Sequence, residues 1–306
     1  MPLLTINHNT EYRYAHPVAF GEHRIMLRPR DGHDLRVLKS QLEITPEPMS
    51  LRYIHDVFGN SVAIATFNQR ARMLTFSSSA TIEHMPADEF APTPDGQAYF
   101  YPFLYDGDEL PDLKQYIAPQ YGDPDGELSA WAREFLDAEG PTPTFKILRD
   151  MTHGIRKAFS YRKRHEHGTQ HPLDTLQTKS GTCRDYALFM IESLRRLGIA
   201  ARFVSGYLFV HGDREHGYVG GGSTHAWVQV YLPSAGWIEF DPTNAIVGSR
   251  DLIRVAVGRD PGQAIPLHGT YFGSADAFLG MEVSINVVSV GENAKTTVSV
   301  GEQVKA

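Results

Sequence analysis

The sequence predicts an α+β protein in which an N-terminal antiparallel β-sandwich precedes a core of helices and strands. Two observations support this prediction. Short apolar runs separated by Pro, Gly and Asn fill roughly the first 85 residues, where no helical periodicity occurs. Beyond residue 126, apolar residues recur every three or four positions, as on one face of a helix, before further strands follow.

Length, charge and cysteine content limit the possible classes of protein. The 306 residues suit two domains, and 29 Lys and Arg against 36 Asp and Glu argue against a nucleic-acid partner. No apolar run reaches about 18 residues, so we expect no membrane partner. The N-terminus shows no signal-peptide pattern, and we expect a cytoplasmic location. One cysteine allows no internal disulfide, and we expect no metal or cofactor.

Residues 1–85 carry the strand signals of the predicted sandwich. The runs "LRYIHDVFGN" and "SVAIATF" meet at Gly59 and Asn60, which favour a turn. The stretch "RMLTFSSSATIEHM" alternates with period two from Met73 onward. Residues 86–126 then become rich in Pro, Gly and Asp but keep many aromatic residues. We interpret them as an ordered connection that packs on its neighbours.

Residues 127–306 form the predicted catalytic core together with the C-terminal strands. The stretch "ELSAWAREFLDAEG" predicts one helix, and Thr142 with Pro143 predicts the start of the next, with the Thr142 hydroxyl as its cap. In "SGTCRDYALFMIESLRRLG", Thr182 and Asp185 match a capping box, and apolar residues follow at helical spacing. Cys183 is therefore expected in the first turn of an amphipathic helix.

Three strands are predicted after this helix, in "ARFVSGYLFV", "THAWVQVYL" and "WIEFDP". The turn "PSAG" joins the last two into a hairpin. If Leu232 faces Gly236, then Asp241 becomes a diagonal neighbour of His225 on one face of the sheet. The tail, "NVVSVGENAKTTVSVGEQVKA", repeats Val-Ser-Val-Gly-Glu and predicts a C-terminal β-hairpin.

A thiol at a helix start, an imidazole and a carboxylate are the parts of a nucleophilic site. Helix N-termini favour a thiolate, a histidine can take and return a proton, and a carboxylate orients that histidine. Taken alone, Cys183 could be a buried core residue, His225 a polar residue of a sheet face, and Asp241 a strand end. The combination of all three favours catalysis.

The motifs "SGTCRDYALFMIESLRRLGIAARFVSGYL" and "STHAWVQVYLPSAGWIEFDPTN" resemble the transglutaminase-like superfamily, whose papain-like core uses Cys, His and Asp in that order. The resemblance is strong over roughly residues 145–245. The stretches "TEYRYAHPVAFGEHRIMLRPR" and "YIHDVFGNSVAIATF" are similar to the N-terminal domain of bacterial transglutaminase-like proteins, and "VAVGRDPGQAIPLHGTYFG" resembles the segment after their core.

This resemblance implies that Cys183 is the nucleophile, His225 the base and Asp241 the orienting carboxylate. It implies hydrolysis of a peptide or isopeptide-like amide of a peptide or protein substrate through a thioester. Transamidation onto a primary amine is the second hypothesis, and a non-catalytic binding module on a degenerate core is the third. Arg184 stands where animal cross-linking enzymes carry Trp, and no calcium loop is visible, so regulated cross-linking is not supported.

Secondary site residues follow from the same chemistry. An acyl-enzyme needs an oxyanion hole, and the backbone N–H of Cys183 is a natural donor. Gln177, six residues before the thiol, and Tyr161 are candidates for the second donor. Trp227 and Trp237 are candidates for lining the cleft, with core packing as the alternative.

Overall fold

The computed structural model describes residues 2–86, 96–162, 168–209, 219 and 222–290. Seven described strands form the N-terminal sheet: β1 (Leu3–Ile25), β2 (Leu35–Thr45), β3 (Ser50–His55), β4 (Ser61–Thr66), β5 (Arg70–His84), β15 (Leu267–Phe272) and β16 (Phe278–Ser289). All of their pairings are antiparallel, as predicted.

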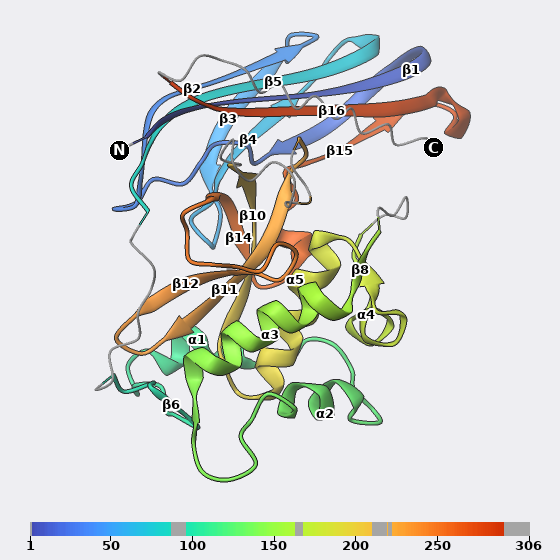
Figure 1. Cartoon of the computed structure of the whole chain (residues 1–306). Coiled ribbons are helices and arrows are strands. Elements are labelled where there is room, and N and C mark those ends of the chain that lie inside the picture. The colour runs from blue at the N-terminus through green and yellow to red at the C-terminus, as the bar shows by residue number, and fades with distance from the viewer. Residues whose placement is uncertain (1, 87–95, 163–167, 210–218, 220–221, 291–306) are drawn as a thin grey trace.

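The long strand β1 is shared by two layers of this domain. Its first half pairs with β5 and β16, and its second half pairs with β4 and β15. The register against β5 shifts between Arg13 and Val18, where the strand changes partners. One layer therefore has the order β2-β5-β1-β16 and the other the order β3-β4-β1-β15, and Figure 1 shows them stacked above the rest of the molecule.

The division into domains differs from the expected one at the C-terminus. We predicted that the C-terminal strands belong to the 127–306 unit, but β15 and β16 pair with β1 and complete the N-terminal sheet. The alternation in these strands predicts that each is a strand, but it does not say which strand each pairs with. The expected closing hairpin cannot be placed, because its second arm lies in 291–306, outside the described residues.

The core sheet has the order β13-β12-β11-β10-β14. Its strands are β10 (Ala201–Leu208), β11 (His225–Leu232), β12 (Gly236–Asp241), β13 (Ile246–Val247) and β14 (Leu252–Gly258). The helices are α1 (Leu110–Ile117), α2 (Glu127–Arg133), α3 (Thr144–Ala158), α4 (Pro172–Thr178) and α5 (Cys183–Arg196), with short turns η2 (Pro261–Gln263) and η3 (Ala275–Ala277). Two small pairs complete the fold: β6 (Phe100–Tyr101) with β7 (Thr142–Pro143), and β8 (Ser160–Tyr161) with β9 (Ser180–Gly181).

Helix α5 is buried almost all round, and it packs against β10, β11 and helices α1, α2, α3 and α4. Of its residues, only Arg184 and Arg196 are not buried. Its predicted apolar face is real, but the opposite face is buried too. There Glu192 and Arg195 form an ion pair of 2.7 Å with no exposed side-chain surface. Glu192 also accepts from the backbone N–H groups of Gln120 and Tyr121, and Arg195 donates to the carbonyl of Tyr116. These bonds compensate the two buried charges and fix the connection against α5.

The described part of the connection, residues 96–126, lies along the core. The Tyr101 hydroxyl donates to the Leu197 carbonyl over 3.0 Å, and the Tyr105 hydroxyl accepts from the Ala200 N–H over 2.7 Å. Its aromatic residues therefore fix it to the end of α5 and the start of β10. The Thr142 hydroxyl does not cap α3 as expected, because it accepts from the Asp137 N–H of the preceding turn.

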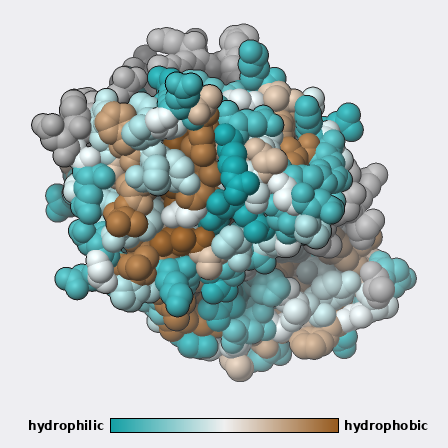
Figure 2. Space-filling model, turned by 90° about the horizontal axis from the view of Figure 1, so that it is seen from below, coloured by the Kyte–Doolittle hydropathy of each residue, from teal (hydrophilic) through white to brown (hydrophobic). Residues whose placement is uncertain are grey.

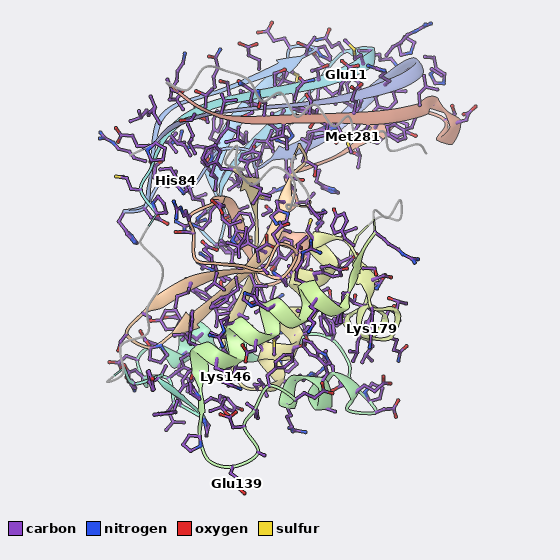
Figure 3. All side chains as sticks on the ribbon, in the orientation of Figure 1. Glu11, His84, Glu139, Lys146, Lys179 and Met281 are labelled. Carbon is purple, nitrogen blue, oxygen red and sulfur yellow. The ribbon has the colours of Figure 1, made fainter. Side chains whose placement is uncertain are left out.

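The two domains share one hydrophobic core. Leu4, Ile6 and Ile82 of the N-terminal sheet belong to the same buried cluster as Tyr207 and Ile253 of the core sheet. Figure 3 shows side chains filling the space between the upper sheet, which carries Glu11 and Met281, and the helical layer, where Lys146 lies on α3. The face of the molecule seen from below is mostly polar, with apolar residues gathered toward one side (Figure 2).

Candidate active site

The start of α5 holds the thiol. Thr182 is the N-cap, and its backbone N–H donates to the Asp185 carboxylate over 2.7 Å while its hydroxyl accepts from the Asp185 N–H. The predicted capping box is thus confirmed. Gly181 has no room for a side chain, since a Cβ there would lie 2.8 Å from Cβ of Asp185. Cys183 is the first helical residue, and 6% of its surface is exposed.

His225 and Asp241 come together across the predicted hairpin. The observed register pairs Leu232 with Gly236 and Val228 with Phe240, which confirms the expected alignment. His225 Nε2 lies 2.7 Å from Asp241 Oδ2, and neither side chain is exposed. A carboxylate at this distance orients the imidazole and stabilises its protonated form.

Asp241 is held by two further donors. Its Oδ1 accepts from the Thr243 N–H over 2.8 Å, and its Oδ2 accepts from Asn244 Nδ2 over 2.9 Å. Asn244 also exchanges two hydrogen bonds with the backbone of Val219, of 2.7 and 3.1 Å. Sequence reasoning gave Asn244 no role. Its position three residues after Asp241, in "DPTN", is the signal that could have drawn attention to it.

The thiol and the imidazole lie within reach of one another. Helix α5 packs against β11, which carries His225. Because Nε2 is bound to Asp241, Nδ1 is the free ring nitrogen, and it has no hydrogen-bond partner among the described residues. Burial lowers the pKa of His225, but the charge of Asp241, its hydrogen bond and the neighbouring Cys183 together raise that pKa to about 10. The site therefore favours a protonated imidazole beside the sulfur.

Trp227 lies beside His225 on the same face of β11. The two rings are stacked, with centroids 6.0 Å apart and an angle of 28° between their planes. The Trp227 indole N–H donates to Glu239, which also accepts from Gln229 over 2.8 Å. Trp227 has no exposed surface, so it supports His225 from within the core and does not line an open cleft.

The other candidates occupy different surroundings. Trp237 lies at the far end of β12 from Asp241, about 13 Å away at 3.3 Å per residue. Its ring packs under the Arg202 guanidinium at 3.9 Å and against Tyr116, so it belongs to the packing of the connection. This corrects the expectation that it lines the cleft.

The two candidates for the second oxyanion donor differ in position. Gln177 is exposed, and its amide donates to the Glu127 carboxylate over 3.2 Å, so the structure does not offer it to the thiol. Tyr161 is half-buried on β8 and pairs with Gly181, two residues before Cys183, which keeps it next to the helix start. Of the two, Tyr161 is better placed for the expected role.

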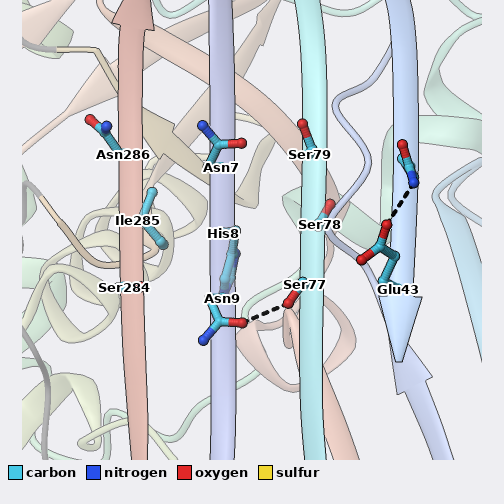
Figure 4. Close-up of a pocket in the computed structure, with 11 residues that line it drawn as sticks. Asn7, His8, Asn9, Glu43, Ser77, Ser78, Ser79, Ser284, Ile285 and Asn286 are labelled. Atoms are coloured by element: carbon cyan, nitrogen blue, oxygen red, sulfur yellow. Dashed lines mark hydrogen bonds between the residues drawn. The ribbon is translucent and has the colours of Figure 1, made fainter. Parts of the chain in front are cut away.

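A hollow of about 310 Å³ lies elsewhere, on the outer face of the N-terminal sheet (Figure 4). Short polar side chains from neighbouring strands line it: Asn7, Asn9, Ser77, Ser79, Ser284 and Asn286. None of the proposed catalytic residues contributes to it.

Across the described ranges, no helix combines the length and the apolar character that a membrane crossing requires.

Comparison with known proteins agrees with this description. Residues 4–83 match the bacterial transglutaminase-like N-terminal region, and residues 129–242 match the transglutaminase-like superfamily. An uncharacterized protein of Mycobacterium tuberculosis is 29% identical over 92% of this chain and 91% of its own length. A protein-glutamine gamma-glutamyltransferase of Pseudomonas aeruginosa is 39% identical over 24% of this chain and 11% of its own.

Among solved structures, one from Cytophaga hutchinsonii described as a "putative cysteine protease" superposes with a TM-score of 0.67. It is 20% identical and covers 96% of this chain and 92% of its own, which shows a shared fold. The predicted fold class and the resemblance read from the motifs are therefore confirmed. The family-model match supports a transglutaminase-like core over residues 129–242, and the solved structure shows the shared fold.

Proposed function

The chain carries a transglutaminase-like core behind a bacterial transglutaminase-like N-terminal region, and on this basis we propose that it is a cysteine-dependent amide hydrolase. Its substrate is a peptide or isopeptide-like amide of a peptide or protein. Cys183 is the nucleophile, His225 exchanges the proton, and Asp241 orients His225.

One observation carries this proposal. His225 is bound to buried Asp241 through Nε2, which leaves Nδ1 for the thiol at the N-terminus of α5. That is the arrangement in which a thiolate and an imidazolium stabilise one another. The raised pKa of His225, about 10, keeps its proton available for a leaving amine at neutral pH.

The reaction follows in two halves. The Cys183 thiolate attacks the amide carbon, the C–N bond breaks, and His225 gives its proton to the departing amine, which leaves a thioester. Neutral His225 then takes a proton from water, whose oxygen attacks the thioester and releases the acid and the thiolate. The oxyanion faces the N–H of Cys183, which as a first-turn group has no acceptor within the helix.

Transamidation is the second candidate, favoured by the similarity to the Pseudomonas aeruginosa protein named as a protein-glutamine gamma-glutamyltransferase. The chemistry up to the thioester is the same, and a primary amine replaces water as the attacking group. Ammonia release measured with and without an added amine, together with incorporation of that amine, separates the two reactions.

The proposal is tested with peptide and isopeptide libraries and a thiol-directed probe on the wild-type protein and on Cys183→Ala, Cys183→Ser and His225→Ala. We expect all three variants to lose at least about 100-fold in amide cleavage, because each removes the nucleophile or the proton carrier. His16→Ala, which changes an exposed histidine of β1, is the matched control and should keep full activity. Retained cleavage by Cys183→Ala would contradict the proposal, because the activity would then not depend on the thiol. An unreactive thiol in the wild type would favour a non-catalytic binding module.

A further inference from the structure

Loops of the N-terminal domain lie along β14, the edge strand of the core sheet. The Arg30 N–H donates to the Arg254 carbonyl over 2.9 Å. Asn60 binds Val257 twice, accepting from its N–H over 2.9 Å and donating to its carbonyl over 2.7 Å. The N-terminal domain is thus hydrogen-bonded to the sheet that carries His225, in addition to packing on it.

Arg254 connects the two domains through its side chain. Its Nη2 donates to Asp34 of the N-terminal domain over 2.7 Å, and its Nη1 donates to Glu239 of β12 over 2.8 Å. The exposed fractions of the three side chains are 17% for Arg254, 11% for Asp34 and 3% for Glu239. Burial would raise the pKa of Asp34, but the hydrogen bond and charge of Arg254 lower it. One guanidinium therefore compensates two carboxylates, one from each domain.

Glu239 carries this connection to the imidazole. It accepts from the indole N–H of Trp227, whose ring is stacked on His225. Gly206 of β10 lies opposite His225 and leaves room for this ring, since a Cβ there would lie 2.6 Å from Cη2 of Trp227. The indole is thus fixed at both ends, by a carboxylate at its nitrogen and by close packing at its six-membered ring.

We infer that Asp34, Arg254, Glu239 and Trp227 are positioning residues through which the N-terminal domain holds His225 in its working orientation. The N-terminal domain is then part of the catalytic centre, not only a brace or a substrate platform. This inference rests on the proposed function, because it assigns these residues to the imidazole that serves Cys183.

The physical reason lies in the shared arginine. Without the Asp34 charge, the Arg254 guanidinium has Glu239 as its remaining ion-pair partner of the two. We expect the guanidinium then to shift toward Glu239 and to move that carboxylate away from the indole N–H. A displaced indole no longer supports the imidazole ring, and its face no longer stabilises the imidazolium charge. Misplacement of a catalytic group by about 1 Å costs up to about 100-fold in rate.

The test uses alkylation of the full chain with iodoacetamide, measured from pH 5 to 11. The sequence contains one cysteine, so every label reports on Cys183. Among the described residues, the titratable groups that act on His225 are Asp241 on β12 and Cys183 on α5, while β10 presents Gly206. None of these groups is changed in the variants Asp34→Asn and Glu239→Gln.

We expect both variants to alkylate about tenfold more slowly at neutral pH. We also expect the alkaline limb, which is the change in alkylation rate that accompanies loss of the His225 proton, to move to lower pH, because His225 holds its proton less tightly. Asp31→Asn is the matched control, since Asp31 lies three residues away and bonds exposed Arg28 and the Val37 N–H. It should give the wild-type profile. Thermal unfolding of each variant separates a loss of fold from a loss of orientation.

Three outcomes would overturn the inference, and they can be told apart. Wild-type alkylation could be fast and dependent on His225 while Asp34→Asn and Glu239→Gln keep the wild-type pH profile. In that case the positioning role is wrong and the proposed function survives. If wild-type alkylation is no faster than in His225→Ala, both the proposed function and the positioning role are wrong. A lower rate with an unshifted alkaline limb also contradicts the positioning role. A general loosening of the fold would lower the rate without changing the proton affinity of His225.

Discussion

Two of the buried histidines, His8 and His225, behave in opposite ways. His8 lies on β1 at the contact between the domains, and His225 lies on β11 beside Cys183. Their exposed fractions are 3% and 1%. Burial lowers the pKa of His8 to about 4, whereas that of His225 is raised to about 10 although burial opposes this.

The partners explain the difference. His8 Nδ1 lies 3.1 Å from the Tyr207 hydroxyl and Nε2 lies 3.0 Å from the Thr10 hydroxyl, so a neutral ring is satisfied by neutral groups. His225 instead faces the Asp241 carboxylate. Burial alone thus produces a neutral histidine, and a buried carboxylate keeps the same side chain protonated, as the proposed proton donor requires.

The largest test of this comparison is Asp241→Asn. The amide keeps the shape and an acceptor for His225 but removes the charge, so burial should prevail and the pKa of His225 should fall from about 10 to below its ordinary 6.5. We expect amide cleavage at neutral pH to drop by about 100-fold or more. The pKa can be measured by NMR titration of the His225 ring.

Asn244→Ala is the companion variant, since it removes a neutral donor to the same carboxylate oxygen and leaves the charge in place. It should leave His225 protonated at neutral pH. If Asp241→Asn left the pKa of His225 near 10, the carboxylate would not be the cause of the difference between the two histidines.

The second test concerns stability against pH. His8 stays neutral in the fold down to about pH 4 but takes up a proton near 6.5 when unfolded, so stability should fall as the pH drops through this window. The loss amounts to about 3 kcal/mol. His225 acts in the opposite direction: its contribution is fully present below pH 6.5 and is lost as the pH rises through about 10.

His8→Gln should flatten the acid side of the stability curve, because glutamine does not titrate. Urea unfolding of the wild type and of this variant between pH 4 and 7 measures the effect. An equally steep acid loss in His8→Gln would mean that other groups cause it and that His8 is not held neutral by the fold.

The sequence predicts the elements that carry Cys183, His225 and Asp241, but it does not predict the surroundings of His8. Thr182, Asp185 and the turn between Leu232 and Gly236 are local signals, and local signals placed Cys183, His225 and Asp241 correctly on their elements. The capping box and the hairpin register depend only on residues close in the chain, which is why they could be read in advance.

The parts that the sequence did not predict depend on contacts between distant segments. Asp34 and Arg254 are 220 residues apart, and nothing local joins them. The pairing of β15 and β16 with β1 has the same cause, because alternation does not specify a partner strand. His8 and His225 both occupy alternating strands, and only the fold shows that one meets hydroxyls and the other a carboxylate.

The smallest expected effect is that of Thr10→Val, which sharpens the comparison from the structural side. Valine keeps the shape of Thr10 but removes the hydroxyl beside His8 Nε2, and Thr10 itself is 2% exposed. We expect a loss of about 1 kcal/mol in the free energy of unfolding, as for one buried hydrogen bond, measured with urea. Alkylation of Cys183 should keep its wild-type rate and pH profile, because no charge near His225 changes. A slower or shifted profile would mean that His8 and His225 are coupled through the shared core, and that His8 also serves the proposed active site.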